Sequence, residues 1–85
     1  MSLSYDQQMT IAIAQGIITK YGAVLQEADI AEIFGLSEAT IRNKFSQGAK
    51  DLPRYTQLKG KRVVMAQDLA EFMVQNTHKF GGGNA

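Results

Sequence analysis

Side chains that can hydrogen bond to the edges of nucleic-acid bases are grouped in one short segment of the chain. Arg42, Asn43 and Gln47 lie within a single stretch of six residues. Arg can donate two hydrogen bonds to guanine, and the amides of Asn and Gln can pair in a similar way with adenine. These three residues, together with Ala39, are therefore the candidates for base reading. For either amide alone, plain solvent exposure explains the residue equally well.

Groups that can bind phosphate surround these candidates. Hydroxyl and basic side chains fix the position of a protein on a duplex without reading its sequence. We expect such backbone contacts from Thr40, Ser46, Lys44, Lys50 and Arg54. A second basic cluster, Lys59, Gly60, Lys61 and Arg62, lies at a glycine turn. We expect this cluster to contact phosphates or to enter a minor groove.

The charges of the chain are divided unevenly along the sequence. The formal net charge is only +1, which by itself argues against a nucleic-acid partner. Residues 39–64, however, contain seven basic residues and one acidic residue, a net charge of +6, and the rest contain two basic and seven acidic residues, a net charge of −5. A basic block suits a phosphate-binding surface, because binding releases counterions, although solvated turns also carry such charges. We expect the basic face toward the partner and the acidic helices turned away.

An N-terminal helix is predicted over residues 4–20. Ser4 and Gln7 have the spacing of a capping box, and Gly22 follows as a terminator. At about 100° per residue, one stripe contains Tyr5, Met9, Ile13 and Ile17, and the nearly opposite stripe contains Ile11, Ala14 and Ile18. One small domain cannot bury both stripes. We therefore expect Ile11 and Ile18 to form a symmetric self-contact; the alternative is that they are half-exposed surface residues.

Residues 26–47 have the spacing of a helix-turn-helix unit. A helix over 26–34 is followed by a helix that Ser37 caps and that runs to Gln47. Ala31 lets the two helices approach, Gly35 supplies the positive φ that reverses the chain, and Ile41 fixes the second helix on the first. The residues expected to fill the space between them are Ile30, Phe34 and Leu36. A helical hairpin that only packs a core is the alternative.

A hairpin and a last helix complete the predicted domain. Two β-rich runs within 54–65 are joined across Lys59, Gly60 and Lys61, which is typical of a hairpin. A helix over 67–77 is expected to bury Leu69, Phe72 and Met73, with Asp68 in its first turn complementing the helix dipole. The fold class is mainly α with a small β-hairpin. A single domain spans 1–80 and a flexible tail spans 81–85.

The chain resembles the excisionase, AlpA and MerR-like winged-helix domains over about residues 24–75. The segments that carry the resemblance are 25–37, 39–41, 52–54, 58–62, 68–69 and 72–73, whereas Gln26, Arg42 and Lys44 depart from the family pattern. The resemblance implies a winged helix-turn-helix with an extra N-terminal helix. In such a fold, helix 37–47 reads the major groove and the wing, residues 58–63, lies along the backbone or minor groove of double-stranded DNA.

The resemblance also implies a class of function. It favours a sequence-specific transcriptional regulator of phage, prophage or mobile-element origin. A recombination directionality factor (excisionase) and a small DNA-packaging subunit are alternatives of the same class, and a non-catalytic protein-interaction module is an alternative of another class. A domain of this size contacts few base pairs, so we expect a homodimer or higher oligomer. An integrase or RNA polymerase is a further candidate partner. We expect the protein itself in a bacterial cytoplasm, associated with the nucleoid.

Catalysis has little support in the sequence. There is no Cys, and the single His, His78, lies beside the Gly-rich tail. Glu27, Asp29 and Glu32 are interpreted as a solvated acidic face rather than a metal site. We expect no enzyme activity, no cofactor and no metal. The longest mostly apolar stretch, 11–18, is far shorter than the roughly 20 residues of a membrane helix, so we expect a cytoplasmic protein without a membrane partner.

Overall fold

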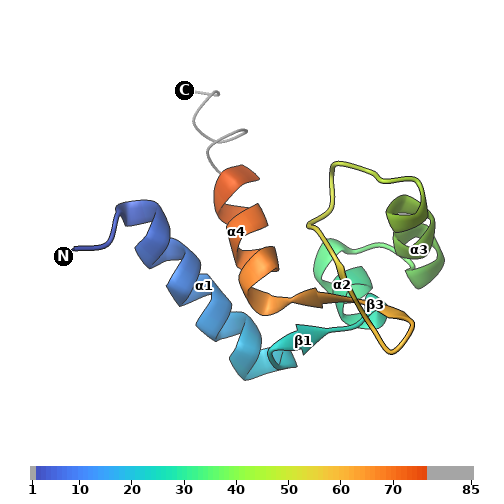
Figure 1. Cartoon of the computed structure of the whole chain (residues 1–85), viewed down its shortest axis with the longest axis horizontal. Helices are drawn as coiled ribbons and strands as arrows, with labels where there is room; N and C mark the ends of the chain where they lie inside the picture. The colour runs from blue at the N-terminus through green and yellow to red at the C-terminus, as the bar shows by residue number, and fades with distance from the viewer. Residues whose placement is uncertain (1, 77–85) are drawn as a thin grey trace.

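The structure is a computed structural model that describes residues 2–76 (Figure 1). Within them the chain forms four helices and a three-stranded antiparallel sheet: α1 (Tyr5–Tyr21), β1 (Val24–Leu25), α2 (Glu27–Phe34), α3 (Glu38–Ser46), β2 (Thr56–Leu58), β3 (Lys61–Met65) and α4 (Ala66–Asn76). The predicted class, mainly α with a small β element, is confirmed. The predicted tail 81–85, His78 and the last residue of the predicted helix 67–77 lie outside the described residues.

The sheet has one strand more than the predicted hairpin. β3 is central, with β1 on one side and β2 on the other. Leu25 pairs with Val64 across β1 and β3, and both side chains are fully buried. The third strand, β1, forms by pairing with β3, and the Ala66 N–H adds a hydrogen bond of 2.9 Å to the Ala23 carbonyl. The sheet therefore ties the segment before α2 to the segment before α4.

The apolar core lies where the sheet, α2, α3 and α4 meet. Its largest fully buried side chains are Leu25, Ile30, Ile41, Val64 and Leu69. Ala31 is buried as well, so the predicted close approach of the first two core helices is confirmed. The prediction for Leu36 is wrong, because its side chain is exposed. Leu36 belongs to the turn after α2, and its side chain is 38% exposed.

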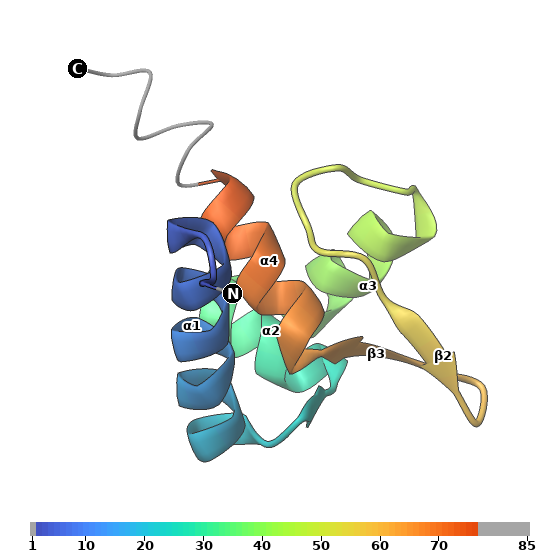
Figure 2. The same ribbon diagram turned by 60° about the vertical axis from the view of Figure 1, so that its left-hand side comes forward.

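The predicted capping box begins α1. The Ser4 hydroxyl accepts from the Gln7 N–H at 3.1 Å, and the Gln7 side chain accepts from the Ser4 N–H at 2.9 Å. The helix packs along α4 (Figure 2). Its buried residues are Thr10, Ala14 and Ile17.

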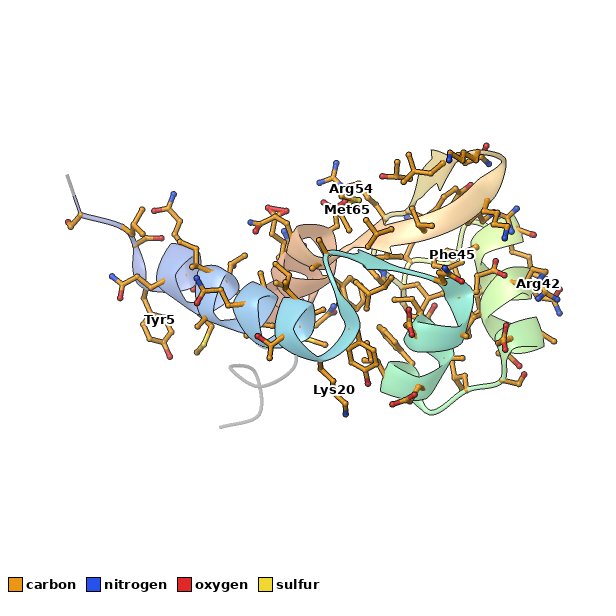
Figure 3. The ribbon with its side chains drawn as sticks, turned by 90° about the horizontal axis from the view of Figure 1, so that it is seen from below. Tyr5, Lys20, Arg42, Phe45, Arg54 and Met65 are labelled. Atoms are coloured by element: carbon orange, nitrogen blue, oxygen red, sulfur yellow. The ribbon has the colours of Figure 1, made fainter. Side chains whose placement is uncertain are left out.

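This packing corrects the predicted stripes of α1. Ala14 lies on the stripe of Ile11 and Ile18, which is expected to face outward, but Ala14 is buried, as is Ala70 of α4. Tyr5 was expected on the inner stripe, but it is 69% exposed at one end of the molecule (Figure 3). The outer positions Ile11 and Ile18 are exposed, as expected, at 43% and 45%.

The turn between α2 and α3 has the predicted chemistry. Gly35 has a φ of 70°, and the Leu36 N–H donates to the Ala31 carbonyl at 3.0 Å, which closes the end of α2. Ser37 caps α3 by accepting from the Thr40 N–H at 3.1 Å. The helix limits differ slightly from the prediction for 26–47: Gln26 caps α2 from outside, and Gln47 caps the end of α3.

The hairpin is shorter than the predicted segment 54–65. Leu58 pairs with Lys61, so only Lys59 and Gly60 form the turn, with φ values of 52° and 78°. Positive φ at both positions is what a two-residue turn needs to match the twist of its strands. Lys61 therefore lies in β3 and not in the turn. Arg54 precedes β2.

Candidate nucleic-acid interface

The third helix and the β2–β3 hairpin lie at the end of the molecule that is farthest from α1 (Figures 1 and 2). A groove of about 730 Å³ is lined by the hairpin, by α3 and by the start of α2. Its charged lining residues are Glu27, Glu38, Arg42, Lys59, Lys61 and Arg62. The tertiary structure thus brings the predicted base-reading segment and the predicted wing to one surface.

One side of α3 faces outward. Ile41 and Phe45 are buried against the core, as predicted. The base-reading candidates Ala39, Arg42, Asn43 and Gln47 are all exposed, although Gln47 lies just beyond the helix. Within the described residues, the amides of Asn43 and Gln47 have no side-chain hydrogen bond. Both amides are available to an incoming partner.

Arg42 is not solitary on this surface. Its Nε donates to Oε1 of Glu27 at 3.3 Å, across the angle between α2 and α3. The Arg42 side chain is 55% exposed and that of Glu27 is 21% exposed. Figure 3 shows Arg42 at the opposite end of the molecule from Tyr5. The arginine is therefore oriented by α2 but open to solvent.

Two of the side chains that are predicted to contact the DNA backbone are also paired with carboxylates of the protein. Lys44 Nζ donates to Oδ2 of Asp51 at 2.7 Å, and the hydrogen bond and charge of Lys44 lower the pKa of the Asp51 carboxyl below its ordinary value of 3.8. Arg54 Nε lies 3.6 Å from Oδ1 of Asp68. Both basic groups remain on the surface. To bind a phosphate, each must either break its ion pair with the carboxylate or contact the carboxylate and the phosphate together.

The other backbone candidates differ in availability. The Thr40 hydroxyl accepts a hydrogen bond of 2.8 Å from the Ser37 hydroxyl in the cap of α3. Ser46 is exposed at the end of α3, and Lys50 is exposed in the loop that follows. Lys50 makes no ion pair within the part of the chain that the structure describes. Of the five candidates, Ser46 and Lys50 are thus the ones without a competing contact there.

The basic hairpin residues line one groove but differ in their contacts. Lys59 and Lys61 are exposed and make no ion pair with any residue in 2–76. Arg62 instead lies over the ring of Tyr55, with its guanidinium carbon 5.4 Å from the ring centroid. Its Nε is buried without a hydrogen-bond partner. Arg62 therefore packs against Tyr55, whereas Lys59 of the turn and Lys61 of the same strand are exposed. That these residues contact phosphate stays a prediction.

Tyr55 also contacts the third helix. Its ring meets that of Phe45 edge to face, with centroids 5.1 Å apart. Aromatic pairs favour this geometry because the positive ring edge meets the negative ring face. Phe45, Tyr55 and Arg62 thus link α3 to β3 through a continuous stack. This stack fixes the hairpin relative to α3.

The acidic side chains of α2 are not merely solvated. Glu27 pairs with Arg42, Oδ2 of Asp29 accepts from the Gln26 N–H at 3.0 Å, and Oε1 of Glu32 accepts from the Tyr21 hydroxyl at 3.0 Å. The expectation that the acidic helices turn away from the basic face is wrong for Glu27. It is also wrong for Asp68 of α4, which reaches Arg54.

Sequence reasoning missed Glu27 and Tyr55 as residues of this surface. Glu27 is separated from Arg42 by many residues and lies on another helix, so no helical spacing indicates the pair. Tyr55 lies in a β-rich run, where an aromatic residue is expected for its strand propensity alone. The only available signals were an acid in the first turn of α2 and an aromatic next to a basic strand.

Other kinds of site find no support among the described residues. There, no group of three or more His, Cys, Asp and Glu side chains could hold a metal ion. None of the helices in residues 2–76 is both long and apolar enough to cross a membrane. No protein-family model, curated protein or solved structure matches the chain. A functional assignment therefore depends on the geometry of this surface.

Proposed function

We propose that this chain is a winged helix-turn-helix DNA-binding domain and acts as a sequence-specific transcriptional regulator. In this proposal α3 enters the major groove and the hairpin lies along the backbone or in the minor groove. The observation that carries the proposal is that the polar face of α3 and the unpaired lysines of the hairpin occupy the same end of the molecule.

The chemistry of this end suits double-stranded DNA. Arg42, Asn43 and Gln47 supply the donors and acceptors that read base edges in a major groove. Lys50, Lys59 and Lys61 supply positive charge that no carboxylate of the described residues neutralises. Backbone contacts provide most of the affinity and base contacts provide the specificity.

Salt-dependent titration tests the role of the hairpin. We expect Lys59→Asn with Lys61→Gln to weaken binding to random duplexes and to lower the slope of log affinity against log salt by about 2, because two phosphate contacts are lost. Asn tolerates the positive φ of residue 59 and is favoured in such turns, so the hairpin is retained. The measurement is fluorescence anisotropy across a series of salt concentrations.

The matched control is Lys20→Gln. Lys20 is exposed on α1 and lies over the ring of its neighbour Tyr21, so its loss removes one lysine charge at a place away from the proposed surface. Its salt slope should equal that of the wild type. Salt-independent or absent binding by the wild type at low ionic strength would reject the DNA-binding function and favour a protein-interaction module.

A further inference from the structure

The contact between Glu27 and Arg42 involves one particular atom of the arginine. Oε1 of Glu27 accepts from Nε, at 3.3 Å. Within residues 2–76, neither terminal Nη nitrogen of Arg42 makes a hydrogen bond. The paired Nη groups are the part of a guanidinium fork that can present two parallel donors to one acceptor edge. Glu27 thus holds the side chain while it leaves this donor pair open.

Glu27 itself is well fixed. It is the first residue of α2, where the helix dipole favours a negative charge, and its side chain is mostly covered. Arg42, by contrast, is a long and largely exposed side chain. Such a side chain samples many rotamers unless a neighbour restrains it. The carboxylate therefore restrains the arginine and not the reverse.

The carboxylate also adds a negative charge to the groove between α2, α3 and the hairpin. This charge opposes DNA phosphates whatever the base sequence. A partner that makes no base contact with Arg42 gains nothing in return for approaching this charge. A partner that offers a guanine edge gains the two hydrogen bonds that Nη can donate.

We propose that Glu27 is a positioning residue that determines the sequence specificity of Arg42. It orients the guanidinium for guanine and disfavours duplexes that lack guanine at that position. This inference rests on the proposed DNA-binding function. It concerns a residue that does not itself contact the base.

Glu38 provides a closely matched control. It is the first residue of α3, as Glu27 is of α2, and it lines the same groove. It makes no ion pair with any described residue. Glu38→Ala therefore removes the same charge from the same groove and the same helical position, but it leaves the ion pair between Glu27 and Arg42 in place.

The experiment selects bound sequences from a random duplex pool with the wild type, Glu27→Ala, Glu38→Ala and Arg42→Ala. We expect Arg42→Ala to lose preference at one base pair and Glu27→Ala to lose about tenfold of the discrimination at that same base pair. Glu38→Ala should keep the discrimination and bind all duplexes more tightly. Glu27→Gln, which keeps an acceptor oxygen, should fall between Glu27→Ala and the wild type.

A second measurement needs no DNA. In the free protein, the NMR resonance of the Arg42 Nε–H should shift in Glu27→Ala and remain unchanged in Glu38→Ala. Circular dichroism confirms that each variant is folded.

The outcomes separate the inference from the function on which it rests. If Arg42→Ala loses a base preference that Glu27→Ala keeps in full, Glu27 does not position Arg42, while the DNA-binding function stands. The same holds if Arg42→Ala keeps every preference, since Arg42 then reads no base. Absence of any DNA binding by the wild type overturns both.

Discussion

At the residue scale, carboxylates hold three of the basic side chains on the proposed DNA surface. Arg42, Lys44 and Arg54 each pair with one acid. Exposed ion pairs such as these contribute about 0–1 kcal/mol, so a phosphate can replace the carboxylate at small cost. The unpaired lysines of the hairpin need no such exchange. We therefore expect these lysines to dominate the first encounter with a polyanion.

The pair between Lys44 and Asp51 gives a pH-dependent prediction. The pKa of Asp51 is lowered in the folded protein, so the pair stabilises the fold above the ordinary carboxyl pKa and loses this effect as pH falls through the lowered value. The wild type should therefore be more stable than Asp51→Asn at about pH 7, and the difference should be smaller at about pH 2. Urea unfolding at both pH values measures it.

The control for this prediction is Lys44→Gln, which removes the basic partner of Asp51. In that background, the pH-dependent difference in stability that Asp51→Asn causes should disappear. A stability difference between the wild type and Asp51→Asn that persists unchanged in acid would assign the effect to the loop conformation and not to the ion pair.

At the scale of elements, a single left-handed residue sets the angle between α2 and α3. Gly35 has a φ of 70°, and the chain leaves α2 and enters the cap of α3 within the next two residues. An added Cβ at Gly35 would meet no atom within 4 Å. The demand for glycine is therefore one of backbone conformation and not of space.

Two glycine substitutions test this demand. Gly35→Ala should lower the free energy of unfolding by about 1–2 kcal/mol, because a residue with a Cβ is strained at positive φ. Gly16→Ala is the matched control, since Gly16 lies within α1 and its Cβ would also meet nothing within 4 Å. That variant should raise the free energy of unfolding by about 0.5–1 kcal/mol. Equal effects of the two substitutions in urea unfolding would contradict the conformational argument.

A second device at this scale joins α3 to the hairpin. The ring of Tyr55 contacts that of Phe45, and the guanidinium of Arg62 lies over the same Tyr55 ring. The stack explains why Arg62 does not project with Lys61 from the same strand. It also joins the third helix to the segment before β2 and to β3.

At the scale of the whole molecule, α1 lies at the end opposite the basic surface (Figure 1). It covers α4 and leaves two large apolar side chains in solvent, Ile11 and Ile18. Their spacing of two helical turns places them on one stripe. The position of α1 would let a second copy bind there without covering the proposed DNA surface.

Self-association through this stripe stays a prediction. We expect the wild type to sediment as a dimer at high concentration and Ile11→Glu with Ile18→Glu to sediment as a monomer, because two buried charges would prevent an apolar contact. Ala12→Glu is the control, since Ala12 is exposed on α1 but outside the stripe. A wild type that remains monomeric at high concentration would refute the contact.

Much of the fold could be predicted from the sequence because local signals determine it. The capping residues Ser4 and Ser37 and the turn residue Gly35 act within a few residues of their positions. The third strand could not be predicted, because a two-residue strand has no periodicity of its own. It forms only where β3 offers it partners.

The exposed face of α3 could likewise be predicted from the spacing of Ile41 and Phe45, which are buried. The ion pairs of the basic side chains on that side of the molecule could not be predicted from the sequence. Glu27 and Asp68 reach basic residues that are distant in sequence, and a net charge counted by segment cannot include such pairs. The segment count therefore located the basic surface but overstated its free charge.

The sequence by itself determined where α1, α2 and α3 begin and end to within about one residue, which side of α3 is apolar and where basic residues concentrate, because these depend on short-range backbone chemistry and periodicity. Only the tertiary structure decided which acidic side chains pair with which basic side chains, that Arg62 lies over Tyr55, and which side of α1 is buried. These are contacts between elements, and their partners are chosen by packing rather than by spacing along the chain.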